Sequence, residues 1–337
     1  MIAKMKLTFI WQEPAFSERE WIAEIFAPLA GRQVLDGQHC IVLDDCLLID
    51  SYLHARPAEY YAQFRGRNAW LLHLSDETYE GGYDAYAHFR GVFRNYRSSV
   101  FRPESVLRLP LGYGDGLAHE PSLLAVVKER KLLWSFVGEA NKASRPEMLR
   151  AFAPLGPQLL RNTESTALGP LSRREYQQTL LDSIFVPCPM GNVSLESFRI
   201  YEALECGAIP LLEKRVFFDY FTGLFDDHPL PTFINWQQAA KFVASIHADT
   251  RAQSELQQQC LAWWHGYKAK LSLRVEDFVA VTAGSKPESA LNWQYRIPGW
   301  QTLELLRHQT LSTLSRRISL QAVRLIRERR LRKTFGK

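Results

Sequence analysis

Residues 183–213 read SIFVPCPMGNVSLESFRIYEALECGAIPLLE, with an apolar run at each end. Its apolar beginning and apolar end predict two buried strands, and the segment between them predicts a Gly-Asn loop followed by a helix. Such a strand–loop–helix–strand order indicates a parallel sheet covered by helices. Backbone N–H groups at a helix N-terminus, together with an arginine, bind phosphate groups, so we expect a diphosphate site here. Its candidate residues are Gly191, Asn192, Ser194, Ser197 and Arg199.

The helix within this stretch places acidic residues on its apolar side. At 100° per residue, one apolar stripe contains Leu195, Phe198, Tyr201 and Leu204. Glu202 and Glu205 fall in the same stripe, where a carboxylate loses hydration unless it is paired or binds a polar ligand. One interpretation is an ion pair between Arg199 and Glu202 within the helix. The other is that Glu202 faces a cleft and accepts hydrogen bonds from a ribose diol.

Short motifs occur in a fixed order along the same stretch. They are Ser183-x-Phe185, Pro189-x-Gly191, Ser197-x-Arg199-x-x-Glu202-Ala203 and Gly207-x-Ile209-Pro210. Together they resemble the signature of the exostosin-type glycosyltransferases. Shorter stretches at 73–77, 93–97, 109–113 and 136–139 are similar to bacterial members of that family. The resemblance extends over residues 65–215.

The resemblance implies an α/β fold of the GT-B type, with two Rossmann-like domains facing across a cleft and C-terminal helices. It also implies a nucleotide-sugar donor, for which we expect a UDP-sugar, and inversion at the anomeric carbon. We expect residues 1–115 to form the acceptor domain and residues 116–285 the donor domain. Residues 286–337 would then be a return segment and a basic amphipathic C-terminal helix.

Bulk properties agree with two globular domains. The chain has 337 residues, more than a single core usually supports, and its composition is ordinary for a globular protein. Its net charge of +5 hides an asymmetry, because residues 307–337 hold ten Lys or Arg and one acid. This basic amphipathic tail suits either a solvated helix or an anionic membrane surface. The remainder is acidic and shows no nucleic-acid motif, so we expect no nucleic-acid partner.

Strands and helices alternate along both halves of the chain. Apolar runs predict strands near 6–11, 40–49, 69–74, 106–111, 132–137 and 232–235. Ser-x-x-Glu capping boxes predict helix starts at Ser17 and Ser172, and a longer helix is expected at 250–272. Residues 114–130 are the predicted linker, and residues 285–300 are the predicted return towards the first domain. Ligands of open parallel sheets bind beyond the carboxyl ends of the strands, so the segments there would line one groove.

Inverting transfer requires a general base and neutralisation of the departing diphosphate. For the base we predict Asp76 or Glu77, with His73 behind them, since all three follow a first-domain strand. A turn cap is the plain alternative for Asp76, and a buried structural histidine is the more common role for a residue such as His73.

Further binding residues are predicted around the same groove. On the donor side, Arg199 is joined by Gly138 and by Lys142 or Arg145, between which the spacing does not decide. On the acceptor side we expect Arg94, Arg97 and Tyr113. The alternative for the two arginines is a structural pair with Asp76 or Glu77.

Several other chemistries lack their motifs. There is no Asp-x-Asp or His-x-x-His metal motif, so we expect neither a metal nor a cofactor besides the nucleotide-sugar co-substrate. The first strand lacks the Gly-x-Gly-x-x-Gly of a dinucleotide oxidoreductase, and no phosphate loop ending in Lys-Ser/Thr is present. A catalytically inactive nucleotide-binding or scaffold protein on the same fold remains the alternative.

The expected location follows from similar considerations. Five scattered cysteines indicate reduced thiols, and neither a signal peptide nor a stretch of ~20 apolar residues is visible. We therefore expect a cytoplasmic enzyme of bacterial type, held by its tail at the inner face of the membrane. Its acceptor would be a glycan such as capsule or lipopolysaccharide, or a polyol phosphate.

Overall fold

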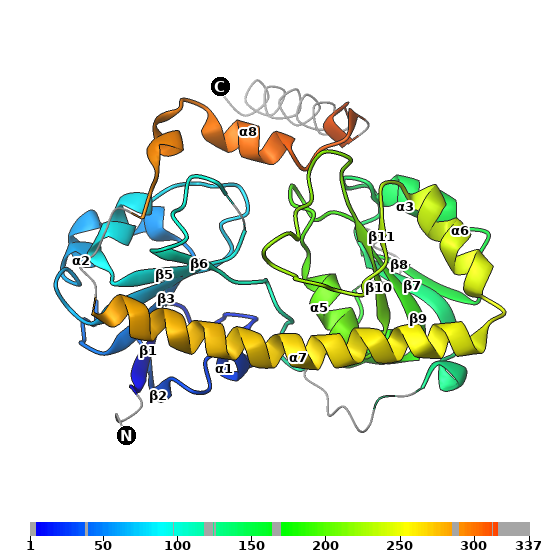
Figure 1. Cartoon of the computed structure of the whole chain (residues 1–337), viewed down its shortest axis with the longest axis horizontal. Coiled ribbons are helices and arrows are strands. Elements are labelled where there is room, and N and C mark those ends of the chain that lie inside the picture. The colour runs from blue at the N-terminus through cyan, green and yellow to red at the C-terminus, as the bar shows by residue number, and fades with distance from the viewer. Residues whose placement is uncertain are drawn as a thin grey trace, which may run out of the picture.

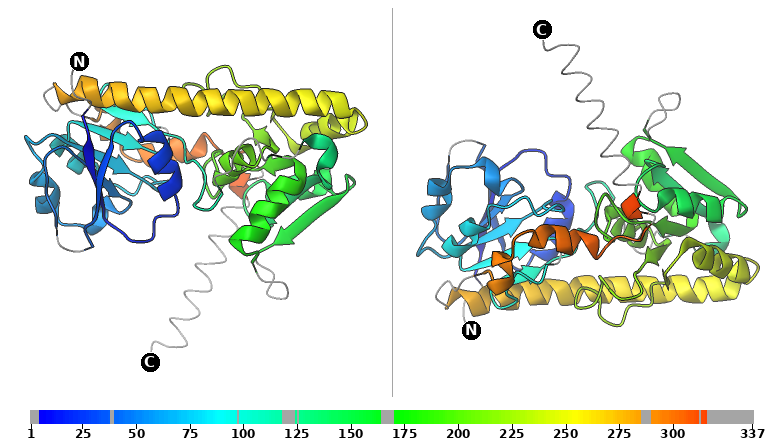
Figure 2. Two further views of the ribbon diagram at one scale, coloured as in Figure 1. Left: turned by 90° about the horizontal axis from the view of Figure 1, so that it is seen from below. Right: turned by 90° about the horizontal axis from the view of Figure 1, so that it is seen from above.

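The computed structural model describes residues 5–37, 40–96, 98–117, 124, 126–163, 170–284, 290–311 and 313–315. It contains two parallel sheets, one in each half of the chain (Figure 1). The two units are joined by a long helix along one side and by a C-terminal segment along another (Figure 2). The α-helices of the described residues are α1 (Arg19–Ile25), α2 (Ala58–Ala62), α3 (Arg145–Phe152), α4 (Arg173–Asp182), α5 (Phe198–Glu205), α6 (Trp236–Ile246), α7 (Thr250–Ala283) and α8 (Trp300–Leu306).

The first sheet has six parallel strands in the order β2-β1-β3-β4-β5-β6. Its central strands β3 and β4 are buried along their whole length, which explains their continuous apolar sequences. The strands are β1 (Leu7–Trp11), β2 (Ala30–Leu35), β3 (Cys46–Asp50), β4 (Ala69–His73), β5 (Gly91–Arg94) and β6 (Val106–Arg108).

The second sheet has five parallel strands in the order β11-β10-β9-β7-β8. The strand order reverses between β7 and β9, and ligands of open α/β sheets bind at such a point. The strands are β7 (Leu132–Gly138), β8 (Gln158–Asn162), β9 (Ser183–Cys188), β10 (Ile209–Glu213) and β11 (Thr232–Phe233).

Helix α7 crosses from the second unit to the first (Figures 1 and 2). Near its start, Gln257 Nε2 donates to the Gly207 carbonyl oxygen of the second unit at 2.8 Å. Near its end, Thr282 Oγ1 accepts from Trp70 Nε1 of the first unit at 2.8 Å. Between them, Lys268 Nζ lies 2.9 Å from carboxylate oxygens of both Glu24 and Glu205, one from each unit. The helix therefore fixes the two sheets relative to each other.

The C-terminal segment makes the second connection. Trp300 of α8 packs on Tyr79 and Tyr83 of the first unit, with ring centroids 5.4 and 6.0 Å apart. Eight residues later, the His308 ring lies against Tyr220 of the second unit. This segment thus joins the two units at a side that α7 does not cover (Figure 2).

The structure differs from the predicted elements in two ways. The edge strands β2 and β8 were not predicted because their mostly exposed residues give no apolar run, and β5 was missed because it ends in the buried Arg94. The chain returns to the first unit within α7, which extends to Ala283, rather than in residues 285–300. The basic tail beyond residue 315 lies outside the described residues.

Of the two predicted capping boxes, one forms. Ser172 and Glu175 bond reciprocally at the start of α4, as predicted. At α1 the prediction is wrong, because the N-cap is Glu18 and no side chain caps it in that way. Instead, the Glu20 N–H donates to Asp115 Oδ1 at 2.9 Å, so the start of the inter-sheet linker satisfies this helix end.

Gly112 provides a test of the interface that α7 organises. Its φ is +75°, and a Cβ there would lie 2.2 Å from the Trp21 ring, which stacks on Trp264 of α7. We predict that Gly112→Ala destabilises the protein by about 3 kcal/mol, from left-handed strain and overpacking together. Gly66→Ala is the matched control, because Gly66 has φ +83° with nothing within 4 Å and should cost only about 1 kcal/mol. Equal losses in chemical denaturation would contradict this view of the interface.

Candidate functional site

A cavity of about 240 Å³ lies between the two units, at the carboxyl ends of β7 and β9. It therefore occupies the point at which the strand order of the second sheet reverses. Most of its lining comes from the loop and helix start of residues 191–202, and the first unit closes the other side. The lining residues are Glu77, Tyr96, Leu111, Arg145, Gly191, Asn192, Glu196, Ser197, Phe198, Arg199 and Glu202.

The start of α5 offers hydrogen-bond donors to this cavity. Ser197 is extended (φ −147°, ψ 151°) and is the N-cap, yet its hydroxyl caps no backbone N–H. Within the part of the chain that the structure describes, Ser197 Oγ and Arg199 Nε have no hydrogen-bond partner although both are buried. Buried polar atoms are rarely left unmatched, and these two line the cavity together with a helix N-terminus. The arrangement is suited to an anionic ligand.

Arg199 is held in position by the end of β7. Its Nη2 donates to the Val137 carbonyl oxygen at 2.6 Å, and its guanidinium stacks over the Phe136 ring at 4.5 Å. Gly138 has φ +154°, and a Cβ there would lie 2.8 Å from Arg199 Nη2. The predicted donor residue Gly138 thus allows the backbone to approach the guanidinium closely.

The sequence left Lys142 and Arg145 as alternatives on the donor side, and the structure distinguishes them. Arg145, the first residue of α3, lines the cavity and donates through Nη1 to the Glu139 carbonyl oxygen at 2.9 Å. Lys142 is not among the lining residues, and its Nζ pairs with Glu139 Oε2 at 2.5 Å. Of these two residues, Arg145 is therefore the one that can contact a ligand in the cavity.

Glu202 lines the cavity although it is 8% exposed. Its Oε2 accepts from the Tyr176 hydroxyl at 2.6 Å, and among the described residues no ion pair joins it to Arg199. Burial raises the pKa of the Glu202 carboxyl, which Tyr176 and the charge of Arg199 partly offset. Its stripe neighbour Glu205 has a different environment, since it accepts from Trp264 Nε1 and pairs with Lys268.

Glu77 reaches the cavity from the first unit. Its Oε1 accepts from the backbone N–H groups of Val193 and Ser194 at 3.0 and 3.1 Å. Its Oε2 accepts from Asn192 Nδ2 at 3.3 Å, so the carboxylate lies against the loop before α5. Ser194 and Asn192, both predicted on the donor side, therefore meet the predicted base across the boundary between the units.

The other two candidate bases are occupied elsewhere. Asp76 is 6% exposed and accepts from the Tyr83 hydroxyl at 2.6 Å and from the Glu80 N–H at 2.7 Å. It also lies 3.2 Å from Arg94 Nη2, so these two residues form the structural pair that the sequence left open. His73 is fully buried with its Nδ1 2.6 Å from the Tyr86 hydroxyl, and burial lowers its pKa well below the usual value. Neither lines the cavity.

Of the remaining acceptor candidates, the structure describes Tyr113, which does not line the cavity. Tyr113 is buried and donates to Glu24 Oε2 at 2.6 Å, while Arg97 lies outside the described residues. Sequence analysis missed Glu196, which is 1% exposed and accepts from the Leu111 N–H at 2.8 Å. The hydroxyls of Tyr201 and Tyr220 also donate to its carboxylate, each at 2.5 Å. No signal distinguished it, because a glutamate just before a helix usually faces solvent.

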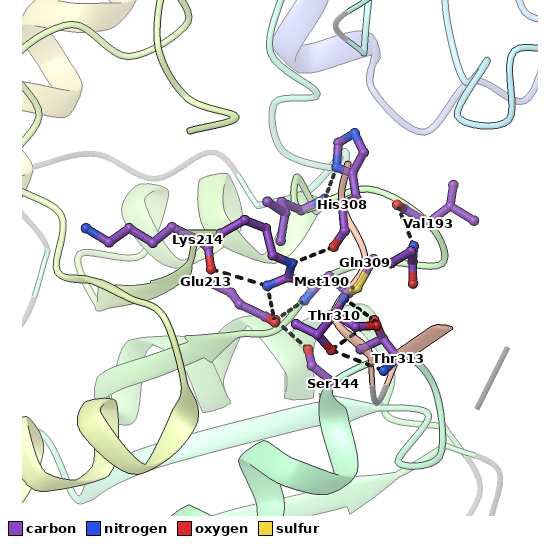
Figure 3. A network of polar contacts seen from close by, with 11 residues as sticks. Ser144, Met190, Val193, Glu213, Lys214, His308, Gln309, Thr310 and Thr313 are labelled. Atoms are coloured by element: carbon purple, nitrogen blue, oxygen red, sulfur yellow. Dashed lines mark hydrogen bonds and ion pairs between the residues drawn. The ribbon is translucent and has the colours of Figure 1, made fainter. Parts of the chain in front are cut away.

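The loop before α5 is supported from behind by the C-terminal segment (Figure 3). The Leu195 N–H donates to His308 Nδ1 at 3.1 Å, and burial lowers the pKa of His308 to about 3, so the imidazole is a neutral acceptor. Arg215 Nε donates to the His308 carbonyl oxygen at 2.7 Å and, through Nη1, Arg215 pairs with Glu213 at 2.7 Å. The loop is therefore fixed between Glu77 on one side and His308 on the other.

The described residues contain neither a metal-binding cluster nor a membrane-spanning helix. No group of three or more His, Cys, Asp or Glu side chains there lies close enough to hold a metal ion. Within the same ranges, none of the helices combines the length and the apolar character needed to cross a bilayer.

Part of the chain is similar to known proteins in sequence. The model of the RXYLT1 C-terminal domain matches residues 117–283. Over 161 residues the chain is 27% identical to ribitol-5-phosphate xylosyltransferase 1 of Mus musculus. That match covers 45% of this chain and 36% of the mouse protein, so it spans about a third of that relative.

Solved structures show the fold. T4 phage BGT, solved with its UDP-glucose substrate, matches with a TM-score of 0.51 at 9% identity, over 83% of this chain and 100% of that one. The DNA-modifying enzyme β-glucosyltransferase, studied with and without uridine diphosphoglucose, matches with a TM-score of 0.50 at 10% identity, over 82% and 99%. The predicted GT-B fold is confirmed. Over residues 117–283, the match to the RXYLT1 C-terminal domain and the similarity to the mouse xylosyltransferase together support an exostosin-like glycosyltransferase.

Proposed function

We propose that the protein is an inverting glycosyltransferase that moves a sugar from a UDP-sugar to a hydroxyl group of a glycan or polyol-phosphate acceptor. The observation that carries this proposal is the cavity at the strand-order reversal, where Ser197, Arg199 and the start of α5 face Glu77 of the other unit. One side offers donors to an anion, and the other side offers a carboxylate to a hydroxyl group. The T4 phage enzyme of similar fold was solved with its UDP-glucose substrate, which supports the choice of a UDP-sugar as donor.

The donor would lie against the second unit. Its diphosphate would accept hydrogen bonds from Ser197 Oγ, from the first N–H groups of α5 and from the guanidinium groups of Arg199 and Arg145. Glu202 would accept from the ribose hydroxyls, since a buried carboxylate gains from polar partners. These cations and the helix dipole would neutralise the diphosphate without a bound metal.

The reaction would be a single displacement. The acceptor oxygen attacks the anomeric carbon on the face opposite the diphosphate, the bond from that carbon to the phosphate oxygen breaks, and the configuration inverts. Glu77 takes the proton of the acceptor hydroxyl, and Arg199 and Arg145 stabilise the charge that develops on UDP. Among Asp76, Glu77 and His73, Glu77 is the residue that lines the cavity.

The cellular setting of this activity is also part of the proposal. We place the enzyme at the inner face of a bacterial cytoplasmic membrane, where the basic residues of 307–337 would attract anionic headgroups. The acceptor would then be a growing capsule, lipopolysaccharide or related surface glycan. This rests on the charge of the tail in the sequence.

Arg145 and Lys142 form a matched pair for testing the donor site. We predict that Arg145→Ala weakens UDP binding about tenfold, because a charge-assisted hydrogen bond to the diphosphate is lost. Lys142→Ala removes the same charge beside the cavity and should change UDP affinity less than about twofold, because Lys142 pairs with Glu139. Isothermal titration calorimetry with UDP measures both. A larger loss in Lys142→Ala than in Arg145→Ala would reverse the assignment.

Glu77 and Asp76 form a second pair, for the base. We predict that Glu77→Gln lowers the transfer rate by about 10²- to 10⁴-fold while UDP affinity remains, because the amide cannot take the hydroxyl proton. Asp76→Asn should act through stability, since it breaks a buried pair with Arg94. The release of UDP measures the transfer rate, and thermal denaturation measures the stability of each variant. Normal turnover in Glu77→Gln would exclude Glu77 as the base.

A further inference from the structure

A second cavity of about 240 Å³ lies beside the candidate donor cavity, and Tyr96 lines both. The first unit supplies seven of its nine lining residues, and the second unit closes it with two. It is therefore placed on the acceptor side of the donor cavity. Its lining residues are Arg94, Tyr96, Ser98, Phe101, Pro103, Val106, Arg108, Thr222 and Gly223.

The charged residues in this lining are two arginines and no acid. Arg94 is 1% exposed and has its three nitrogens bonded to the Asn95 carbonyl oxygen, the Tyr86 hydroxyl and Asp76. Its guanidinium also stacks over the Phe101 ring at 4.0 Å. Arg94 is thus a fixed cation in the wall, with its hydrogen bonds directed into the protein.

Arg108 differs from Arg94 because its donors are only partly used. Its Nη1 donates to the Tyr220 carbonyl oxygen at 3.1 Å, and its guanidinium lies over the Tyr220 ring at 4.3 Å. Its Nη2 is 3.5 Å from Glu196 Oε2, and among the described residues neither Nη2 nor Nε has a hydrogen-bond partner. A guanidinium carries five N–H donors, so Arg108 retains capacity to bind an oxyanion.

The partner of Arg108 is itself engaged. The Glu196 carboxylate already accepts from the Leu111 N–H and from the hydroxyls of Tyr201 and Tyr220. These three donors occupy the Glu196 carboxylate, and its 3.5 Å ion pair with Arg108 Nη2 is not a hydrogen bond, so Arg108 keeps N–H groups to donate to a ligand. Arginine binds phosphate oxygens in a bidentate geometry that lysine cannot reproduce.

We propose that this second cavity is a subsite for a phosphate group of the acceptor, with Arg108 as the residue that binds it. The proposal rests on the proposed function and adds where and how an anionic acceptor is recognised. A phosphate monoester offers several charged acceptor oxygens, which suit the Nε and Nη2 groups of Arg108 that have no hydrogen-bond partner among the described residues. Because Tyr96 separates the two cavities, an acceptor anchored through its phosphate extends past Tyr96 and presents a hydroxyl group to Glu77.

The test is a calorimetric titration of the full chain, with saturating UDP and also without it, using ribitol 5-phosphate, ribitol and glucuronate. We expect ribitol 5-phosphate to bind at least about tenfold more tightly than either of the others, as a charge-assisted contact to arginine requires. Arg108→Gln should weaken ribitol 5-phosphate binding by about tenfold or more and change UDP affinity less than about twofold.

A second variant keeps the test valid if Arg108→Gln folds poorly. Ser98→Asp adds a negative charge to the lining and retains an oxygen that can accept from the Val100 N–H, as Ser98 Oγ does at 3.2 Å. It should weaken ribitol 5-phosphate binding as Arg108→Gln does. Ser245→Asp adds the same charge on the exposed face of α6 and should leave that binding unchanged.

Three results would overturn the proposal. The first is that ribitol and ribitol 5-phosphate bind equally tightly. The second is that Ser98→Asp binds ribitol 5-phosphate as tightly as the wild-type protein does. The third is that Arg199→Ala loses ribitol 5-phosphate binding while Ser98→Asp keeps it. The last would show that the phosphate occupies the donor cavity. If the wild-type protein fails to bind UDP, the assignment of the donor cavity is wrong. The titration without UDP still tests whether the second cavity binds ribitol 5-phosphate.

Discussion

The candidate site depends on how α7 holds the two sheets. Neither sheet alone encloses a ligand, because the carboxyl ends of parallel strands leave an open edge. Lys268 pairs with a glutamate from each unit, and Trp264 stacks on Trp21 at 5.7 Å, so the middle of α7 is fixed to both. The distance across the cavity, from Glu77 to the start of α5, follows from this arrangement. The segment through His308 then fixes the loop that carries the donor residues.

Charges near the cavity fall into two kinds. Acidic groups such as Glu196 and Asp76 are surrounded by donors within the protein, so their role is to position neighbouring side chains. Two arginines, by contrast, lie at cavity walls and stack on an aromatic ring. Arg199 lies over the Phe136 ring, and Arg108 lies over the Tyr220 ring. The resulting surface favours ligands that carry negative charge.

Much of this could be predicted from the sequence, and the rest could not for physical reasons. The 183–213 stretch predicted its own strands and helix, because burial and helical spacing are local properties. It left Glu202 open between an ion pair with Arg199 and a position facing a cleft, and in the structure Glu202 lines the cavity. Residues 30–35 and 158–162 form edge strands whose exposed side chains leave no apolar pattern. Spacing could not separate Arg145 from Lys142, or Glu77 from Asp76, since the three-dimensional partners of each decide its role. Glu196 and Arg108 depend on contacts more than 80 residues apart in sequence, which no local pattern reveals.

The most direct test of the account is a calorimetric and thermal-shift titration of the protein with UDP, GDP, CMP, ADP and NAD. We predict selective stabilisation by UDP, with affinity reduced about tenfold or more in Arg199→Ala and in Glu202→Ala, which face the cavity from one helix. Both variants should retain their fold by circular dichroism. Binding of no nucleotide, or unchanged UDP affinity in both variants, would contradict the assignment of this cavity to a nucleotide-sugar donor.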